Sequence, residues 1–111
     1  NPVAAAAGNA YLETVAEEHL LDNVKTVSAY LKDQLAAIDD SRIKEIRGMG
    51  LLLGMEMTVE AAPMVNSCLK QGLLLLNAGP NVIRFLPPLN ITEELVDSAV
   101  AILKKVFKEE A

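Results

Sequence analysis

One arginine lies inside an apolar segment of the chain. The segment NVIRFLPPLN, residues 81–90, places Arg84 between an isoleucine and a phenylalanine, and two prolines follow shortly after it. A guanidinium stays charged at physiological pH and is costly to bury alone, so an anionic group must meet it. Its planar set of N–H donors binds a carboxylate through two parallel hydrogen bonds. Arg84 is therefore our candidate for binding the carboxylate of an amino acid or a keto acid.

The same guanidinium has an alternative, internal partner. If its segment forms a strand, Arg84 shares one face with Val82 and Leu86 and points where apolar groups also point. An ion pair with Glu45 or Glu56 on a neighbouring strand would then satisfy its charge. Structural pairs of this type are common, so the spacing alone leaves both ligand binding and internal pairing open.

Glycines and a second arginine are concentrated in RGMGLLLG, residues 47–54. Gly48, Gly50 and Gly54 lack the spacing of the dinucleotide-binding fingerprint, and the Gly-Lys-Ser/Thr of a Walker loop is absent. We therefore predict that these glycines let the chain turn and let another backbone approach closely, instead of binding a nucleotide. Arg47, just before the turn, is either a solvated edge residue or an interdomain contact.

The remaining reactive side chains give weaker signals. His19 is the single histidine of the chain, so we predict a polar residue at a helix surface or junction and no metal site. Cys68 is the single cysteine, which excludes an internal disulfide, and its place on the apolar side of a short helical segment predicts a core thiol. We predict no metal ligand within this chain.

Helical patterns occupy both ends of the chain. Apolar residues at steps of three and four predict an amphipathic helix that ends near Asp39, with the stripe Leu20, Val24, Val27, Leu31, Leu35 and Ile38. The preceding segment also favours helix, with Pro2 in its first turn and Gly8 as a bend or a close packing contact. The N-terminal third is thus one long bent helix or two successive helices. The last helix begins after the capping residue Thr92 and should bury Leu95, Ala99, Ile102 and Val106.

The middle of the chain predicts short strands and one short helix. Residues 43–57 fit a strand, a glycine-containing turn and a second strand. The next segment fits a helix with Pro63 in its first turn, Gly72 as its stop, and an apolar side made of Val65, Cys68 and Leu69. The segments LLLL and NVIRFL then form two strands joined by the turn NAGP. This order predicts an α+β fold, in which a small, mostly antiparallel sheet of about four strands packs against helices.

Length and composition indicate one small domain. The chain has 111 residues, of which 51% are apolar, and this is enough to build a core. A net charge of −5 with scattered basic residues argues against a nucleic-acid partner. The apolar runs fall short of the roughly 20 residues needed to cross a bilayer, so we expect a soluble protein without a membrane partner. The single cysteine fits a reducing compartment, and we expect a cytoplasmic location. There is no initiator methionine or signal peptide, and we expect a piece of a longer chain.

Four segments in register resemble the C-terminal part of class III pyridoxal-phosphate aminotransferases: NPVAAAA, IRGMGLLLGMEM, GLLLLNAGPNVIRFLPPLNIT and the closing amphipathic helix. The resemblance covers nearly the whole chain and is greatest to the acetylornithine aminotransferases of arginine biosynthesis. It implies a fold-type I enzyme, a homodimer with active sites at the subunit interface, of which residues 1–111 are the small C-terminal domain. In that family the arginine of the IRFLPP segment helps to hold the substrate carboxylate, and here that arginine is Arg84.

The resemblance also implies which parts lie elsewhere. The lysine that carries pyridoxal phosphate, the aspartate that pairs with its ring nitrogen and the phosphate-binding residues belong to the large domain, upstream of Asn1. The lysines present match no catalytic position: Lys25, Lys32, Lys44, Lys70, Lys104, Lys105 and Lys108. We expect the parent enzyme to transfer an amino group from N-acetylornithine to 2-oxoglutarate, and this chain alone neither to bind the cofactor well nor to transaminate.

Alternative functions remain open at this point. The ornithine, succinylornithine and 4-aminobutyrate aminotransferases share much of the same C-terminal pattern, and their selectivity depends partly on large-domain residues. A hypothesis of a different class is a stand-alone module that binds a small acid at Arg84 or pairs through an exposed strand.

Overall fold

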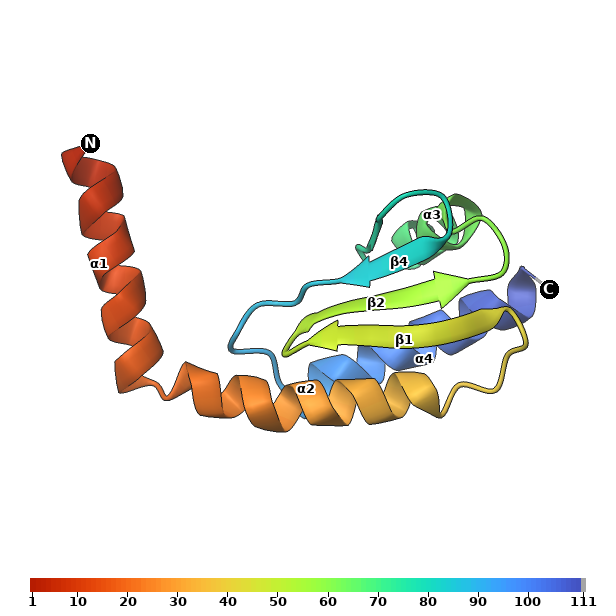
Figure 1. The fold of residues 1–111 in the computed structure, drawn as a ribbon, viewed down its shortest axis with the longest axis horizontal. Helices are drawn as coiled ribbons and strands as arrows, with labels where there is room; N and C mark the ends of the chain where they lie inside the picture. Colours follow the sequence, from red (N-terminus) through yellow and green to blue (C-terminus); the bar gives the residue numbers. More distant parts are fainter. Residues whose placement is uncertain (111) are drawn as a thin grey trace.

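The computed structural model describes residues 1–110, which form four helices and four strands. The elements follow the predicted order, with the N-terminal third divided into two successive helices (Figure 1). In chain order they are α1 (Pro2–Glu17), α2 (Leu20–Ala36), β1 (Ile43–Met49), β2 (Leu52–Met57), α3 (Ala62–Lys70), β3 (Leu76–Asn77), β4 (Val82–Phe85) and α4 (Glu93–Glu109).

The four strands form one sheet in the order β1-β2-β4-β3, and every neighbouring pair is antiparallel. This confirms the predicted α+β fold with a small antiparallel sheet. The hairpin of β1 and β2 depends on glycine at position 48, where φ is 138° and an added Cβ would lie 2.1 Å from the Leu52 carbonyl oxygen. Gly50 follows with a φ of 57° in the turn itself. These two glycines therefore let the chain turn, as predicted.

One predicted strand is much shorter than expected. Of the segment LLLL, only Leu76 pairs in the sheet, opposite Arg84. The physical reason lies at the end of α3, where the backbone N–H of Leu73 donates to the Cys68 carbonyl at 2.9 Å. The first leucine of the segment thus completes the end of the helix, and the chain pairs with the sheet only from Leu76 onward.

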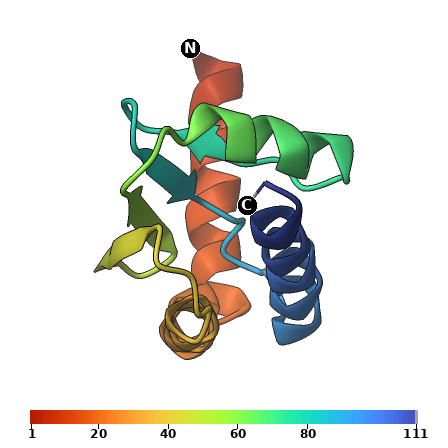
Figure 2. The ribbon, with the colours of Figure 1, turned by 90° about the vertical axis from the view of Figure 1, so that its right-hand side faces the viewer.

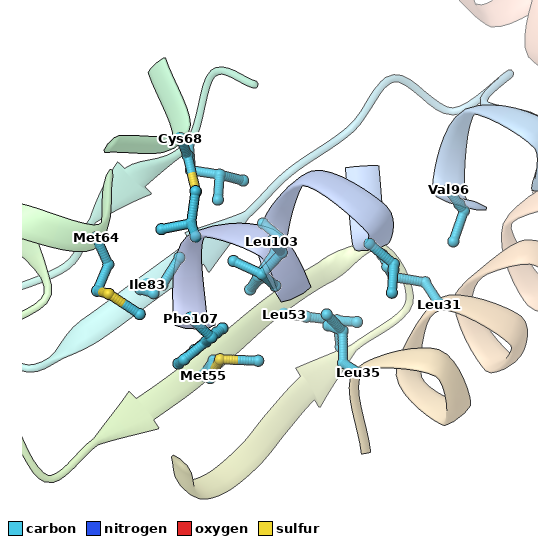
Figure 3. Packing of buried hydrophobic residues seen from close by; sticks show 14 of the residues in the cluster. Leu31, Leu35, Leu53, Met55, Met64, Cys68, Ile83, Val96, Leu103 and Phe107 are labelled. Atoms are coloured by element: carbon cyan, nitrogen blue, oxygen red, sulfur yellow. The ribbon is translucent and has the colours of Figure 1, made fainter. Parts of the chain in front are cut away.

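The helices α2, α3 and α4 cover one face of the sheet, whereas the described residues leave the opposite face uncovered (Figure 2). Alternate residues of β2 and β4 project from the covered face into the core, where they meet the apolar sides of the helices (Figure 3). The predicted stripe of α2 is confirmed, since Val27, Leu31 and Leu35 are buried. The largest fully buried side chains come from helices and strands alike: Leu35, Met55, Met57, Ile83, Leu103, Val96, Val106 and Cys68.

Of the predicted buried face of α4, Val106 is confirmed, whereas the other three positions are wrong by one residue. The residues that α4 buries are Val96, Val100, Leu103, Val106 and Phe107. Leu95, by contrast, is 58% exposed, and Ala99 and Ile102 are only partly buried. Both stripes recur at steps of three and four, so periodicity alone does not choose between them. Packing against the sheet selects the stripe that includes the large Phe107 side chain.

A similar correction applies to α3. Leu69, predicted to lie on the apolar side, is 56% exposed, whereas Met64 is 2% exposed and lies in the core. Cys68 is fully buried and Val65 partly buried, as the sequence predicts. The helix is short, so a small rotation about its axis is enough to exchange Leu69 for Met64.

The first helix, α1, projects away from the sheet and has no buried residue (Figure 1). The bend predicted at Gly8 is wrong, because α1 continues through Gly8. Among residues 1–110 no packing contact is made there either, since an added Cβ would meet nothing within 4 Å. The chain bends instead at His19, which has a left-handed φ of 51° and lies exposed at the junction of α1 and α2. Among the helices of residues 1–110, none is long and apolar enough to cross a bilayer.

Polar side chains satisfy both ends of α4. At its beginning, the Thr92 hydroxyl accepts a hydrogen bond from the backbone N–H of Leu95 at 3.3 Å, which confirms the predicted cap. At its end, Arg42 donates to the carbonyls of Phe107 and Glu110 while pairing with Asp40 at 2.8 Å. The positive guanidinium thus meets the partial negative charge of the last carbonyls and joins the segment just before β1 to the C-terminal helix.

Replacing Arg42 tests this contact. We expect Arg42→Met to lower the free energy of unfolding by about 2 kcal/mol, because it removes charge-assisted hydrogen bonds to the end of α4 and leaves the largely buried Asp40 carboxylate without its partner. Urea denaturation measures the difference. Arg42→Lys serves as the comparison, since a single ammonium keeps the charge without reaching every acceptor, and its loss should be smaller.

The pH dependence of the same contact has a defined sign. Hydrogen bonding to Arg42 holds the pKa of Asp40 below its ordinary value of 3.8. The stabilisation is therefore present above that value and is lost as the pH falls through the lowered pKa of the folded state. The stability difference between wild type and Arg42→Met should narrow in acid, and an undiminished difference would contradict the ion pair.

Candidate functional site

Arg84 lies in the middle of β4 on the uncovered face of the sheet. The two adjacent residues of β4 point into the core, so the alternation of side chains places Arg84 outside. The strand register aligns it with Gly54 of β2 and Leu76 of β3. Gly54 in turn pairs with Arg47 of β1. Two arginines therefore lie on the same row across the sheet, separated by a glycine.

An open hollow of about 620 Å³ lies around this row. Arg47 and Arg84 contribute its charged groups, and the remaining lining is mostly apolar: Gly48, Met49, Leu52, Leu53, Gly54, Ala78, Val82 and Leu86. Its large apolar side chains are unusually accessible, with Met49 89% and Leu86 65% exposed. A concave apolar surface with a few charged donors suits a small organic anion such as a carboxylate.

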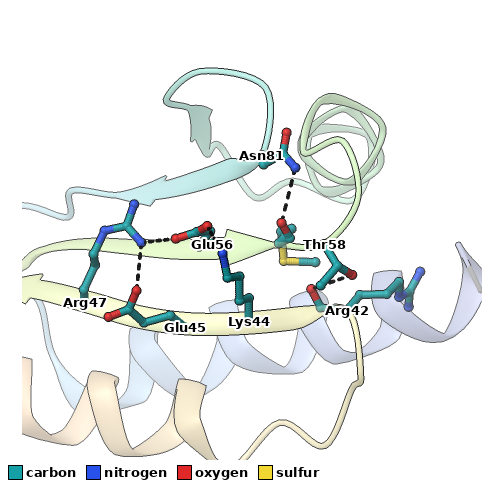
Figure 4. Close-up of polar contacts among 8 residues, drawn as sticks. Arg42, Lys44, Glu45, Arg47, Glu56, Thr58 and Asn81 are labelled. Atoms are coloured by element: carbon teal, nitrogen blue, oxygen red, sulfur yellow. Dashed lines mark hydrogen bonds and ion pairs between the residues drawn. The ribbon is translucent and has the colours of Figure 1, made fainter.

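Two carboxylates hold the guanidinium of Arg47 (Figure 4). Its Nη1 atom lies 3.2 Å from Oε2 of Glu45 and 2.5 Å from Oε2 of Glu56. Glu56 also accepts a hydrogen bond from Nζ of Lys44 at 2.9 Å. Hydrogen bonds from Lys44 and Arg47 lower the pKa of Glu56, and the bond to Glu56 raises the pKa of Arg47. The charge of Arg47 is thus compensated by groups of the same sheet face.

The internal ion pair considered for Arg84 is not formed. Glu45 and Glu56 pair with Arg47, and none of the ion pairs among residues 1–110 includes Arg84. Glu56 lies two residues from Gly54 along β2, at the same offset from Arg47 and from Arg84, and its carboxylate oxygens accept from Lys44 and Arg47 of β1. Arg84 is also exposed, so the sheet does not bury its charge. Its guanidinium is available to an anion from outside the described residues.

Arg47 itself lies on the edge strand β1, and its side chain is 48% exposed. This agrees with the interpretation of Arg47 as a solvated edge residue, although two glutamates hold it in place. The other interpretation, an interdomain contact, stays a prediction.

The predicted turn NAGP leads into β4. Its backbone closes through a hydrogen bond from the N–H of Ala78 to the Val82 carbonyl at 2.8 Å, and Gly79 has a φ of 75°. The Asn77 amide also donates to the Gly79 carbonyl at 3.3 Å. The turn thus connects β3 to β4, which pairs with β2 in the register that places Arg84 opposite Gly54.

A residue that the sequence analysis missed fixes the segment after β4. The side-chain amide of Asn23, in the first turns of α2, donates to the carbonyls of Leu89 at 2.7 Å and Ile91 at 3.1 Å. Because two prolines precede these residues, the segment has few backbone donors, and Asn23 joins it to the helix layer. The available signal was an amide beside the apolar stripe of an amphipathic helix, which indicates a partly buried polar contact.

The other candidate residues behave as structural groups. Cys68 is fully buried, and burial raises the pKa of its thiol to about 11, which confirms a core thiol. His19 is exposed at the helix junction, with Nδ1 4.0 Å from a carboxylate oxygen of Asp22. In residues 1–110 no group of three or more His, Cys, Asp and Glu side chains is arranged to hold a metal ion.

Comparison with known proteins places these observations in a family. A model of the aminotransferase class-III family matches residues 1–107. The chain is 41% identical to an ornithine aminotransferase of Staphylococcus carnosus, over 96% of this chain and 27% of that protein. It is 39% identical to a mitochondrial acetylornithine aminotransferase of Yarrowia lipolytica, over 100% of this chain and 28% of that protein. The chain thus spans little more than a quarter of the length of these curated relatives.

Solved structures agree with the sequence comparison. The fold is similar to that of an N-acetylornithine aminotransferase from Stenotrophomonas maltophilia, with a TM-score of 0.90 and 36% sequence identity. The match covers 98% of this chain and 32% of that chain. The arrangement of helices on one face of a small sheet is therefore shared with a known enzyme of this type.

The state of Cys68 gives a prediction at alkaline pH. The thiol of the unfolded chain ionises near its ordinary pKa of 9.0, whereas the folded thiol stays protonated up to about 11. Burial of the neutral thiol therefore stabilises the fold below pH 9 and loses this contribution as the pH rises through 11. Urea denaturation over this range should show a steeper loss for wild type than for Cys68→Ala. Equal pH dependence in the two proteins would contradict the prediction.

Proposed function

Because the chain belongs to the aminotransferase class-III family, we propose that it is the small C-terminal domain of an acetylornithine aminotransferase and that Arg84 holds a substrate carboxylate. The whole enzyme would transfer an amino group from N-acetylornithine to 2-oxoglutarate, a step of arginine biosynthesis. The family resemblance further implies a homodimer, and we include this assembly in the proposal. The cytoplasmic location expected from the sequence stays a prediction.

The observation that supports the role of Arg84 is its lack of an internal partner. The two other arginines of the chain each hold carboxylates, Arg42 with Asp40 and Arg47 with the two glutamates of the sheet. Arg84 has the same strong preference for a carboxylate, and it lies exposed in a mostly apolar hollow. A substrate carboxylate would supply the missing anion.

The sheet gives Arg84 the fixed position that orientation requires. Its backbone pairs with β2 on one side and with β3 on the other, so the base of the side chain is held by both neighbouring strands. Two parallel hydrogen bonds to a carboxylate then define the direction as well as the place of the substrate. N-acetylornithine and 2-oxoglutarate each carry a carboxylate, so one guanidinium can orient both in turn. Binding energy is thereby used for orientation.

The residues of this chain do not by themselves fit the cofactor that the family implies. Pyridoxal phosphate requires a lysine amine at the substrate site. The lysines of residues 1–110 are all exposed, and none lines the hollow around Arg84. Lys44, on the same sheet face, is paired with Glu56. We therefore assign cofactor binding to parts of the enzyme outside this chain, and the role of this chain is limited to holding the substrate.

The choice of amine donor is a separate part of the proposal. The relatives include enzymes named for ornithine as well as for acetylornithine. We favour N-acetylornithine because of the likeness in LNAGPNVIRFLPPL. In the complete enzyme, N-acetylornithine without any keto acid should abolish the absorbance band of the bound cofactor. Adding 2-oxoglutarate should restore that band. Faster conversion by ornithine or 4-aminobutyrate would assign a different amine donor within the same family.

Replacing Arg84 in the complete enzyme tests its role. We expect Arg84→Lys to reduce kcat/KM by roughly 10- to 100-fold for both N-acetylornithine and 2-oxoglutarate, since a single ammonium cannot reproduce two parallel hydrogen bonds. Steady-state kinetics with each substrate varied in turn measures the effect.

Arg47→Lys is the matched comparison for this experiment. Arg47 lies in the same row, but its guanidinium already contacts Glu45 and Glu56, so its replacement should have a smaller effect on kcat/KM. Unchanged kinetics in Arg84→Lys, or a larger effect in Arg47→Lys, would overturn the assignment. The stand-alone acid-binding hypothesis would gain support if the complete protein bound 2-oxoglutarate without any amino transfer.

A further inference from the structure

The backbone angles at position 54 do not require a glycine. Of the six glycines in the chain, Gly48, Gly50, Gly72 and Gly79 have positive φ, where a side chain would be strained. Gly54 has no positive φ and lies within the regular strand β2. The irregularity in the pairing of β1 and β2 falls between Ile43 and Glu45, away from Gly54. Neither a turn nor a bulge therefore accounts for it.

Glycine inside a strand carries a conformational cost. It loses more backbone entropy on folding than other residues do, by roughly 0.5–1 kcal/mol relative to alanine, and it contributes no side chain to the sheet surface. When no turn or bulge needs it, a strand glycine commonly marks a place where a ligand or another backbone approaches closely. At Gly54 this place is the uncovered face, directly beneath the hollow.

The space above Gly54 has a defined electrostatic character. Arg47 and Arg84 flank Gly54 on the two neighbouring strands, so their Cα atoms are about 10 Å apart at the usual strand spacing. Arg47 is compensated by its glutamates, whereas Arg84 has no ion-pair partner within residues 1–110. An anion entering this space is therefore attracted to the Arg84 side. A carboxylate and its first carbon fit over a glycine and would collide with a larger side chain.

We propose that Gly54 forms the floor of the carboxylate site, keeping the sheet surface beside Arg84 open so that the carboxylate end of the substrate lies against the backbone of β2. This inference rests on the proposed function of Arg84 and adds a specificity-determining residue to it. Gly54 limits the size of the group that carries the carboxylate, while Arg84 holds the charge.

The structure also indicates how a side chain at position 54 would act. An added Cβ would lie 3.3 Å from the Cγ1 atom of Val82 and 4.0 Å from the Arg47 carbonyl oxygen. A movement of a few tenths of an ångström accommodates alanine, so Gly54→Ala should fold normally while placing a methyl group in the space for the carboxylate. Gly54→Val would fill that space further.

The test uses the complete enzyme and glutarate, a dicarboxylate without the reacting keto group. Isothermal titration calorimetry should show roughly tenfold weaker glutarate binding in Gly54→Ala, comparable to the effect of one misplaced methylene in a binding pocket, and a larger loss in Gly54→Val. The matched control is Gly8→Ala, because Gly8 also lacks a positive φ, lies on α1 far from the hollow (Figure 1), and has nothing within 4 Å of an added Cβ among residues 1–110. Gly8→Ala should bind glutarate as wild type does. The thermal midpoint of Gly54→Ala should stay within about 2 °C of wild type.

A double variant shows whether Gly54 acts through the carboxylate held by Arg84. If both residues act on one carboxylate, Gly54→Ala should weaken glutarate binding less in an Arg84→Lys background than in wild type. If the two substitutions instead weaken glutarate binding by factors that simply multiply in the double variant, Gly54 and Arg84 do not act on the same carboxylate, and the inference is overturned.

The outcomes separate this inference from the proposed function. If Arg84→Lys weakens glutarate binding and Gly54→Ala does not, Gly54 is not the floor, although Arg84 keeps its role. If neither variant changes binding, both proposals fall. If Gly54→Ala lowers the thermal midpoint strongly without changing glutarate affinity, another backbone packs over Gly54, and the inference is overturned.

Discussion

The structure depends on a sheet that is covered on one face only. Neighbouring residues of a strand point to opposite faces of the sheet. Because α2, α3 and α4 cover one face, every second residue of a strand points into the core (Figure 2). In β4 this constraint buries Ile83 and Phe85 and places Arg84 on the other side. The two residues that adjoin Arg84 in the sequence thus lie on the opposite face of the sheet, whereas Val82 and Leu86 line the hollow beside it. Ile83 and Phe85 pack in the core and hold β4 in place, and the guanidinium of Arg84 lies on the exposed side of the same strand.

Charge pairing on the uncovered face then distinguishes two arginines that the sequence presents alike. Arg47 and Arg84 occupy the same row across the sheet, but the carboxylates of Glu45 and Glu56 contact Arg47, and no ion pair among residues 1–110 includes Arg84. The result is one compensated and one uncompensated guanidinium facing the same hollow. An incoming carboxylate is attracted to one side of the row, and this asymmetry gives the candidate site a direction that a symmetric pair of arginines would lack.

The glycines of the hairpin region serve two physical purposes. Gly48 and Gly50 adopt backbone angles that a side chain would strain, and Gly48 also lies too close to the Leu52 carbonyl to carry a Cβ. Gly54 has no positive φ, and its proposed role is to leave room for a carboxylate on the uncovered face. In RGMGLLLG, two glycines are therefore needed for the backbone angles of the hairpin, and the third lies on the floor of the hollow on the uncovered face. On the other face of the sheet, hydrogen bonds of Thr92 and Arg42 satisfy the two ends of α4 in the helix layer.

Local backbone preferences and the spacing of apolar residues were enough to predict the order of the elements, the turn residues, the cap of α4 and the stripe of α2. The sequence by itself also identified Arg84 as the residue with chemistry to explain, and its segments identified the family. Tertiary structure decided which of two adjacent stripes α4 buries, how little of LLLL enters the sheet, and that the chain bends at His19 instead of Gly8. It also decided the partner of each arginine and the contact of Asn23 with the segment after β4. These features depend on strand register and on contacts between residues far apart in the chain, and local periodicity carries no information about either.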